Sequence, residues 1–188
     1  MADSDIEIPP YLQSAVGRVG PLDSAAIAID LGFGSTSTPL YLWAQGWPVL
    51  AVDIDPKAVA RLKREVTTHM LDRLTVVCTD FEIIALPAAF FIYAGYSLQY
   101  VRPDNFHAFW HRVRRAMVPG GYFCGNFFGK NDLFARCEDF SIFDDALLHE
   151  LFVGWKIEYW NEFEGPGGRD PSRRWHFYTV TAKYHGLQ

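Results

Sequence analysis

The hydrophobic positions of this 188-residue chain fall into short continuous runs that alternate with longer amphipathic segments. Five apolar runs, each bounded by turn or charged residues, predict buried strands at 26–30, 48–53, 74–78, 90–94 and 122–127. Between them, apolar residues at helical spacing predict helices at about 39–45, 56–70 and 103–117. Strands that alternate with helices are typical of a doubly wound, parallel α/β sheet with helices on both faces.

Prolines and polar residues mark where these helices begin. Pro39, Pro56 and Pro103 each stand where a first helical turn tolerates a missing amide. Thr38 and Asp55 precede two of them and are therefore predicted N-caps.

The last part of the chain has a different pattern. It predicts an amphipathic helix at 143–152 and two long strands at 156–163 and 175–184, separated by a loop rich in glycine and proline. With these two strands the predicted sheet has about seven.

A glycine turn after the first predicted strand is the strongest indication of chemistry. Gly32 and Gly34 allow the backbone to approach a ligand closely, and Asp53 ends the second strand 23 residues (53 − 30) after Asp30. A carboxylate at about this offset accepts hydrogen bonds from ribose hydroxyls. Ser37 stands where a dinucleotide fingerprint has its third glycine, which disfavours a nicotinamide or flavin cofactor.

Residues 30–36 have the sequence Asp-Leu-Gly-Phe-Gly-Ser-Thr, which resembles the first motif of the class I S-adenosylmethionine-dependent methyltransferases. The order of elements resembles this family along nearly the whole chain. Residues 175–183 resemble the end of a small bacterial subgroup related to the tellurite-resistance enzymes. The resemblance implies S-adenosylmethionine as the cofactor and an antiparallel last strand inserted between the fifth and the sixth.

One residue departs from that motif. Thr36 replaces its last glycine, and a β-branched side chain resists positive φ and narrows the space near the cofactor carboxylate. Lower cofactor affinity is one expectation, and direct binding of the carboxylate by hydroxyls and amides at this helix start is the other.

The resemblance also implies which residues hold the cofactor. Asp53 would accept from the ribose, Ile54 would pack on the adenine, and Asp80 would accept from the adenine amine. An acid at a strand end often only caps a helix, so that alternative stays open for both acids. The expected cofactor-binding residues are Asp30, Gly32, Phe33, Gly34, Asp53, Ile54, Asp80, Phe81 and Ala94.

Catalysis leaves a weaker pattern, because methyl transfer depends mostly on alignment in a dry pocket. The acceptor pocket is expected between the loop after the fourth strand and the carboxy-terminal hairpin. The expected catalytic residues are Tyr96 from the loop and Arg174 and His176 from the hairpin. A neutral imidazole can accept a proton near physiological pH, but His176 can equally be a buried histidine satisfied by a backbone group.

Composition limits the other possibilities. Hydrophobic residues make up 49% and charged residues 21%, as in a globular protein, and 188 residues suit a single domain with residues 1–20 as an amino-terminal cap segment. The apolar runs are too short to span a membrane, and the acidic amino terminus does not resemble a secretion signal, so a cytoplasmic protein without membrane contact is expected.

Charge and potential metal ligands exclude further classes. The net charge is −5 without a long basic stripe, so nucleic acid is not an expected partner. No metal site is expected, because Cys78, Cys124 and Cys137 lack ligand spacing and His107 with His111 has no third ligand.

We therefore expect an S-adenosylmethionine-dependent methyltransferase that acts on a small-molecule acceptor as a monomer or homodimer. Thr36 and the lack of a decisive base leave an alternative. In it, a catalytically silent protein, or a non-methylating one such as a cyclase, keeps the fold and the cofactor site.

Overall fold

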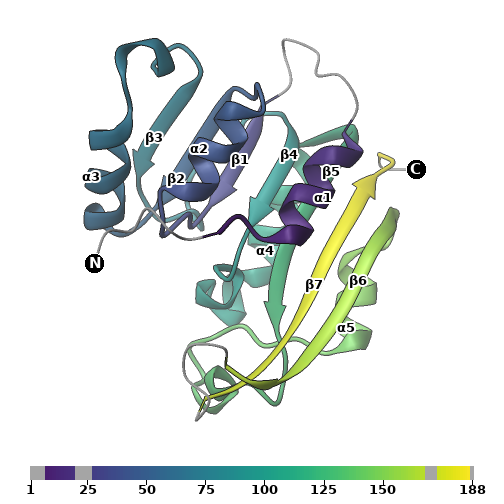
Figure 1. Cartoon of the computed structure of the whole chain (residues 1–188). Coiled ribbons are helices and arrows are strands. Elements are labelled where there is room, and N and C mark those ends of the chain that lie inside the picture. Colours follow the sequence, from purple (N-terminus) through teal and green to yellow (C-terminus); the bar gives the residue numbers. More distant parts are fainter. Residues whose placement is uncertain (1–6, 20–26, 168–172, 187–188) are drawn as a thin grey trace.

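A seven-stranded, mostly parallel sheet forms the centre of the computed structural model, which describes residues 7–19, 27–167 and 173–186 (Figure 1). Strands β1 to β5 are parallel, and β7 lies antiparallel between β5 and β6. In spatial order the strands are β3 (Leu74–Cys78), β2 (Val49–Asp53), β1 (Ala28–Leu31), β4 (Ala89–Ala94), β5 (Met117–Phe128), β7 (Arg174–Tyr184) and β6 (Trp155–Pro166). The predicted fold class and the inserted antiparallel strand are confirmed.

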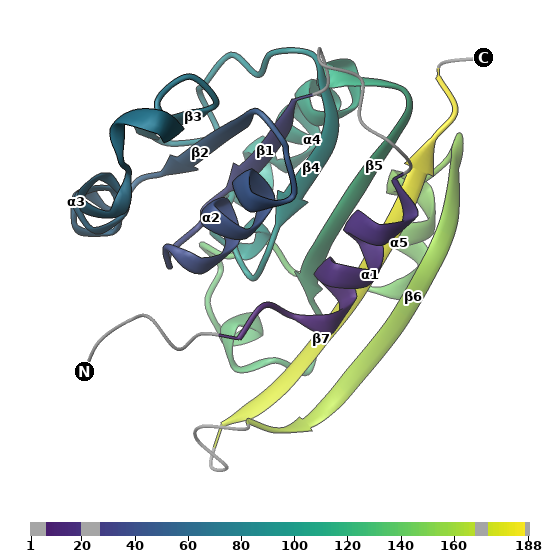
Figure 2. The same cartoon turned by 45° about the horizontal axis from the view of Figure 1, so that its top comes forward.

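Helices cover both faces of this sheet (Figures 1 and 2). One face carries α1 (Pro10–Arg18), α2 (Ser37–Ala44) and α3 (Pro56–Glu65), and the other carries α4 (Pro103–Ala116) and α5 (Asp145–Leu151). Each layer buries its own apolar core, because a helix must bury its apolar stripe against the sheet. Among the described residues, no helix has the length and apolar character needed to cross a bilayer.

Several predicted boundaries differ from the structure. The helix predicted at 56–70 ends at Glu65, because Val66 is extended, and a separate 3-10 helix, η2 (Thr68–Met70), follows. Strand β5 begins at Met117 rather than at 122, because the chain pairs with β4 immediately after α4 through a bulge in their register. Residue 26 of the first predicted strand lies outside the described residues.

The two predicted helix caps have different outcomes. Asp55 accepts a hydrogen bond from the Lys57 amide at 2.8 Å, as an N-cap does. Thr38 is not a cap, because α2 begins at Ser37, two residues before the predicted start, and Thr36 holds the N-cap position. The Thr38 hydroxyl instead donates to the buried carboxylate of Asp30 at 2.5 Å.

Candidate cofactor and acceptor site

The predicted cofactor-binding residues meet at one edge of the sheet. Four neighbouring parallel strands, β3, β2, β1 and β4, present their carboxyl ends there. Ligands of open α/β sheets bind outside these ends. The glycine turn follows β1, Asp53 and Ala94 end β2 and β4, and Asp80 lies two residues beyond β3.

The turn after β1 needs both of its glycines in the left-handed region. Gly32 has φ +72 and Gly34 has φ +55. A Cβ on Gly32 would lie 2.6 Å from the Cβ of Ser97, whereas a Cβ on Gly34 would meet no atom within 4 Å. Gly32 is therefore required by close packing, and Gly34 borders open space where a ligand has room.

Asp53 fixes this turn. One carboxylate oxygen accepts from the Gly34 amide at 2.7 Å, and the other accepts from the Asp55 amide at 2.8 Å. The next residue, Ile54, is 63% exposed although it is apolar. A buried acid beside an exposed apolar side chain matches the two surfaces of an adenosine, a polar ribose and a flat base.

Asp30 is a buried acid beneath the turn. Desolvation raises its pKa from 3.8 to about 7, although the hydrogen bond from Thr38 opposes this. Its Oδ1 atom is buried and has no hydrogen-bond partner among the described residues. An unpaired buried carboxylate oxygen is rare and is a candidate contact for a ligand.

Thr36 occupies the motif-glycine position without backbone strain. Its φ is −73 and its ψ is −18, an ordinary right-handed conformation, and its side chain is 3% exposed. The expected conflict with positive φ does not arise, because Thr36, the N-cap of α2, already has the negative φ of the helix that follows.

The remaining predicted cofactor-binding residues at this edge of the sheet are Asp80, Phe81, Ala94 and Phe33. Asp80 accepts from the Glu82 amide at 2.7 Å and so stabilises the turn after β3. Phe81 is 7% exposed, packs on Phe109 and faces Gly32, and Ala94 is fully buried. Phe33 is 6% exposed and belongs to the core under α1 and α2.

Tyr96 lies at the end of β4, where an acceptor would approach the edge. It has φ 53 and is the one non-glycine residue with positive φ among the described residues. Such strain costs about 1–3 kcal/mol and concentrates at functional sites. Its ring packs edge-on against Trp175 and Phe177 of β7, with centroid distances of 5.7 and 5.2 Å.

Behind Tyr96 runs a chain of neutral hydrogen bonds. The Tyr11 hydroxyl, from α1, donates to Asn126 Oδ1 at 2.8 Å and lies 3.1 Å from the Tyr93 hydroxyl. Asn126 donates in turn to Thr179 at 3.0 Å. Since Tyr11 gives its proton to Asn126, Tyr93 donates to Tyr11.

His176 faces away from Tyr96. Its ring is 1% exposed, and Nε2 lies 2.9 Å from a carboxylate oxygen of Glu162. Nδ1 accepts from the Asn131 amide at 3.1 Å, so the proton of the neutral ring is on Nε2. The structure therefore places the His176 side chain on the opposite face of β7 from Tyr96, because successive residues of a strand point to opposite faces and Trp175 and Phe177 pack on Tyr96.

Arg174 is also placed differently from the expectation. Its side chain is exposed and pairs with Glu164. Together they border a polar cavity of about 480 Å³ that is also lined by Lys130, Asn131, Asp132, Ala135 and Arg136. Arg174 is therefore beside the hairpin end and not beside Tyr96.

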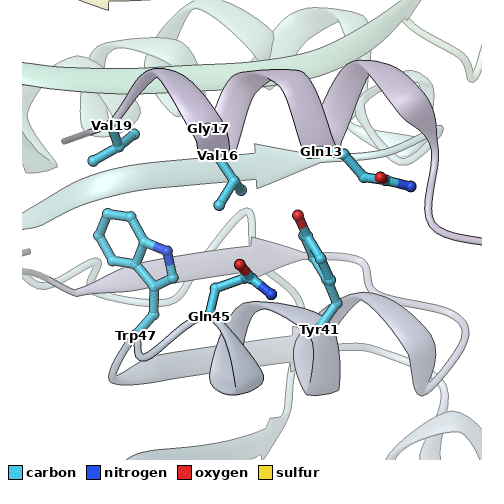
Figure 3. A pocket seen from close by; sticks show the side chains of 7 residues that line it. All are labelled: Gln13, Val16, Gly17, Val19, Tyr41, Gln45 and Trp47. Carbon is cyan, nitrogen blue, oxygen red and sulfur yellow. The ribbon is translucent and has the colours of Figure 1, made fainter. Parts of the chain in front are cut away.

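A separate small cavity lies between α1 and α2 (Figure 3). Its volume is about 200 Å³, below the 300–1,000 Å³ usual for ligand pockets. Trp47, which lines it, lies two residues before the start of β2, so the cavity is toward the opposite edge of the sheet. None of the predicted cofactor-binding residues lines it.

The sequence matches the methyltransferase domain family over residues 29–125, just over half of the chain. The chain therefore belongs to this methyltransferase family. Its resemblance to class I methyltransferases and its expected enzyme class are confirmed, and S-adenosylmethionine is the cofactor of the family.

Curated relatives share only part of their length with the chain. The carboxy-S-adenosyl-L-methionine synthase of Vibrio parahaemolyticus is 25% identical over 128 residues, which are 68% of this chain and 47% of that relative. The synthase of the same name from Pseudomonas putida is 29% identical over 100 residues, 50% of this chain and 40% of the relative. The chain spans about half the length of the curated relatives it matches.

Solved structures share the fold at low identity. TehB from Haemophilus influenzae has a TM-score of 0.78 and 17% identity, over 96% of this chain and 64% of TehB. An S-adenosylmethionine-dependent methyltransferase from Methanosarcina mazei has a TM-score of 0.72 and 16% identity, over 97% of this chain and 100% of that one.

Two residues of the site were not predicted. Ser97 donates to the Leu31 carbonyl at 2.6 Å and so joins the β4 exit loop to the glycine turn. Tyr11 reaches Asn126 across 115 positions of sequence. A serine in a loop and a tyrosine near the start of a chain carry no local pattern that would identify either contact.

Proposed function

We propose that this chain transfers a methyl group from S-adenosylmethionine to a small-molecule acceptor. The cradle formed by Gly34, Asp53 and Ile54 over the unpaired oxygen of Asp30 is the observation that carries the proposal. It offers open space, an acceptor for hydroxyl groups and an apolar surface within one turn, and these suit a nucleoside that carries an amino acid through its sulfur.

The residues divide this binding among them. A carboxylate has about four lone-pair sites, so Asp53 keeps acceptor capacity for ribose hydroxyls while it holds the Gly34 and Asp55 amides. Ile54 packs against the base, and Asp80 and Phe81 border it from the end of β3. Gly32, Phe33 and Ala94 shape the floor of the cradle.

Bound S-adenosylmethionine supplies a methyl group on a positively charged sulfur. The protein has to hold the acceptor in line with that carbon and exclude water. Tyr96, strained at the end of β4, is the residue that we assign to contact with the acceptor. His176 and Arg174, which bind protein groups, are assigned to support of the hairpin.

A second candidate function is a reaction that modifies the cofactor instead of methylating an acceptor. The curated relatives that match the chain are named carboxy-S-adenosyl-L-methionine synthases. Mass spectrometry of the nucleoside products separates the two candidates, because methyl transfer leaves S-adenosylhomocysteine and the alternative leaves a modified sulfonium.

Calorimetric titration with S-adenosylmethionine and S-adenosylhomocysteine tests the binding site. Ile54→Asp should weaken both by at least about tenfold, because burying a side chain of this size contributes roughly 1.5–3 kcal/mol. Val153→Asp is the matched control, since Val153 is 66% exposed in the turn after α5. If neither nucleoside binds the wild-type protein at millimolar concentration, the proposal fails.

A further inference from the structure

The β6–β7 hairpin extends past the end of β5 (Figure 1). Five aromatic rings contact one another beside this extension, on the face of the sheet that carries α1. These rings, here called the aromatic wall, belong to Tyr96, Phe128, Phe134, Trp175 and Phe177. We propose that the aromatic wall is the acceptor subsite and that its ligand is a planar, uncharged aromatic molecule. This inference rests on the proposed function in one respect only, which is that the bound ligand would be methylated.

The aromatic wall is accessible as well as packed. Phe128 is 1% exposed and forms its base, whereas the other four rings are only partly buried. Phe128 lies 5.7 Å from Trp175 and 5.5 Å from Phe134 between ring centroids. Rings at such distances present faces and edges on which a further aromatic ring can stack or pack edge-on.

The position of the aromatic wall favours an acceptor rather than a second core. Tyr96 joins it to the end of β4, only two residues beyond Ala94. The strained φ of Tyr96 is maintained where its ring contacts Phe128, Trp175 and Phe177. Tyr96 thus links the proposed cofactor site at the carboxyl ends of the strands to the partly exposed aromatic wall, and a strained residue in such a place is expected to contact substrate.

The charges around the aromatic wall favour an uncharged ligand. Burial raises the pKa of Tyr11, Tyr93 and Tyr96, so these phenols stay protonated. One cation is already present, and a buried acid balances it: the Arg173 guanidinium lies 4.0 Å from the Trp175 ring centroid, 4.7 Å from that of Phe134 and 3.8 Å from a carboxylate oxygen of Asp132. A cationic ligand would meet this guanidinium, whereas a neutral planar ring would not be repelled.

Three probes of similar size test the ligand class: 2-naphthol, its saturated counterpart decahydro-2-naphthol, and the planar cation N-methylquinolinium. The readout is the indole N–H signal of Trp175 in the NMR spectrum of the full chain, assigned by its loss in Trp175→Phe. We expect millimolar 2-naphthol to shift this signal at least about tenfold more than either other probe, because only it combines stacking with neutrality.

Variants locate the binding. Because Trp175→Ala has no indole signal at this position, calorimetric titration measures 2-naphthol binding to the variants. Trp175→Ala should weaken this binding by at least about tenfold, and Phe177→Leu makes the same test with less risk to folding. Trp43→Ala is the matched control, because Trp43 is also half-buried and also has an arginine, Arg73, over its ring at 5.3 Å. It should leave binding unchanged.

The proposal is overturned if 2-naphthol leaves the Trp175 signal unmoved, if the saturated or cationic probe shifts it equally, or if Trp43→Ala weakens binding as much as Trp175→Ala. These measurements need no cofactor. Failure of S-adenosylmethionine to bind would therefore refute the proposed function without deciding the ligand of the aromatic wall, and the reverse also holds.

Discussion

Asp30 should make the stability of this protein depend on pH in an unusual direction. Its folded-state pKa of about 7 is above the ordinary 3.8, because burial disfavours the charged form. Between about pH 4 and pH 7, Asp30 therefore keeps a proton in the folded protein that it has lost in the unfolded chain. Stability should rise as pH falls from about 7 to about 4, at about 1.4 kcal/mol per pH unit.

Asp30→Asn isolates this contribution, because asparagine resembles the protonated acid and does not titrate. Between about pH 5 and pH 7 the free energy of unfolding of the wild type should fall by about 2–3 kcal/mol relative to the variant. Urea unfolding followed by tryptophan fluorescence at several pH values measures the difference. Above the folded-state pKa, both states are ionised and the two curves should run parallel.

Thr38→Val extends the test. The Thr38 hydroxyl lowers the pKa of Asp30, so its removal should move the divergence from Asp30→Asn to higher pH. If the wild-type and Asp30→Asn stabilities change in parallel from about pH 5 to about pH 8, then Asp30 is ionised at its ordinary pKa and the buried-acid argument is refuted.

Three other substitutions, the last of them with a control variant, have defined outcomes. Asp53→Ala should weaken S-adenosylmethionine binding by at least about tenfold in a folded protein, since a hydrogen bond to a charged group contributes about 1.5–3 kcal/mol; unchanged affinity in calorimetry would remove Asp53 from the ribose site. Thr36→Gly should leave cofactor affinity within about threefold and lower stability by roughly 0.5–1 kcal/mol, because φ −73 needs no glycine; a clear gain or loss of affinity would show that the side chain affects the ligand. Gly129→Ala should destabilise the protein by about 1–3 kcal/mol in the same urea assay, because its Cβ would overlap the His176 ring. The control Gly17→Ala, with open space around it in α1, should be neutral or stabilising. Equal effects of the two substitutions would mean that the His176 ring is free to move.

The cofactor edge was predictable because its pattern is local. The turn at Gly32 and Gly34, the acid at Asp53 and the alternation of strands with helices all follow from residues within a short distance along the chain. Parallel strands then bring their carboxyl ends together without further information. Family resemblance adds the identity of the ligand and the inserted β7.

The acceptor side was less predictable because its contacts are long-range. Tyr11 and Asn126 are 115 positions apart, and Thr38 reaches Asp30 only because α2 begins earlier than its proline suggests. Neither helix-start patterns nor composition specify such pairs. Aromatic residues make up 16% of the chain, and this excess alone does not distinguish core packing from an acceptor pocket. The structure separates a buried core from the partly exposed aromatic wall.

His176 and its neighbours in β7 have different surroundings, because alternate residues of a strand face opposite sides of the sheet. Register pairs Phe177 with Phe128 and Thr179 with Asn126, so odd-numbered residues of β7 face α1. His176 must then face the other way, where Asn131 and Glu162 hold both ring nitrogens and Gly129 lies against the ring. Its hydrogen bond from Asn131 ties the loop before Phe134 to the same strand that carries Trp175. An effect of His176 on an acceptor would therefore act through the geometry of the aromatic wall and not through transfer of a proton.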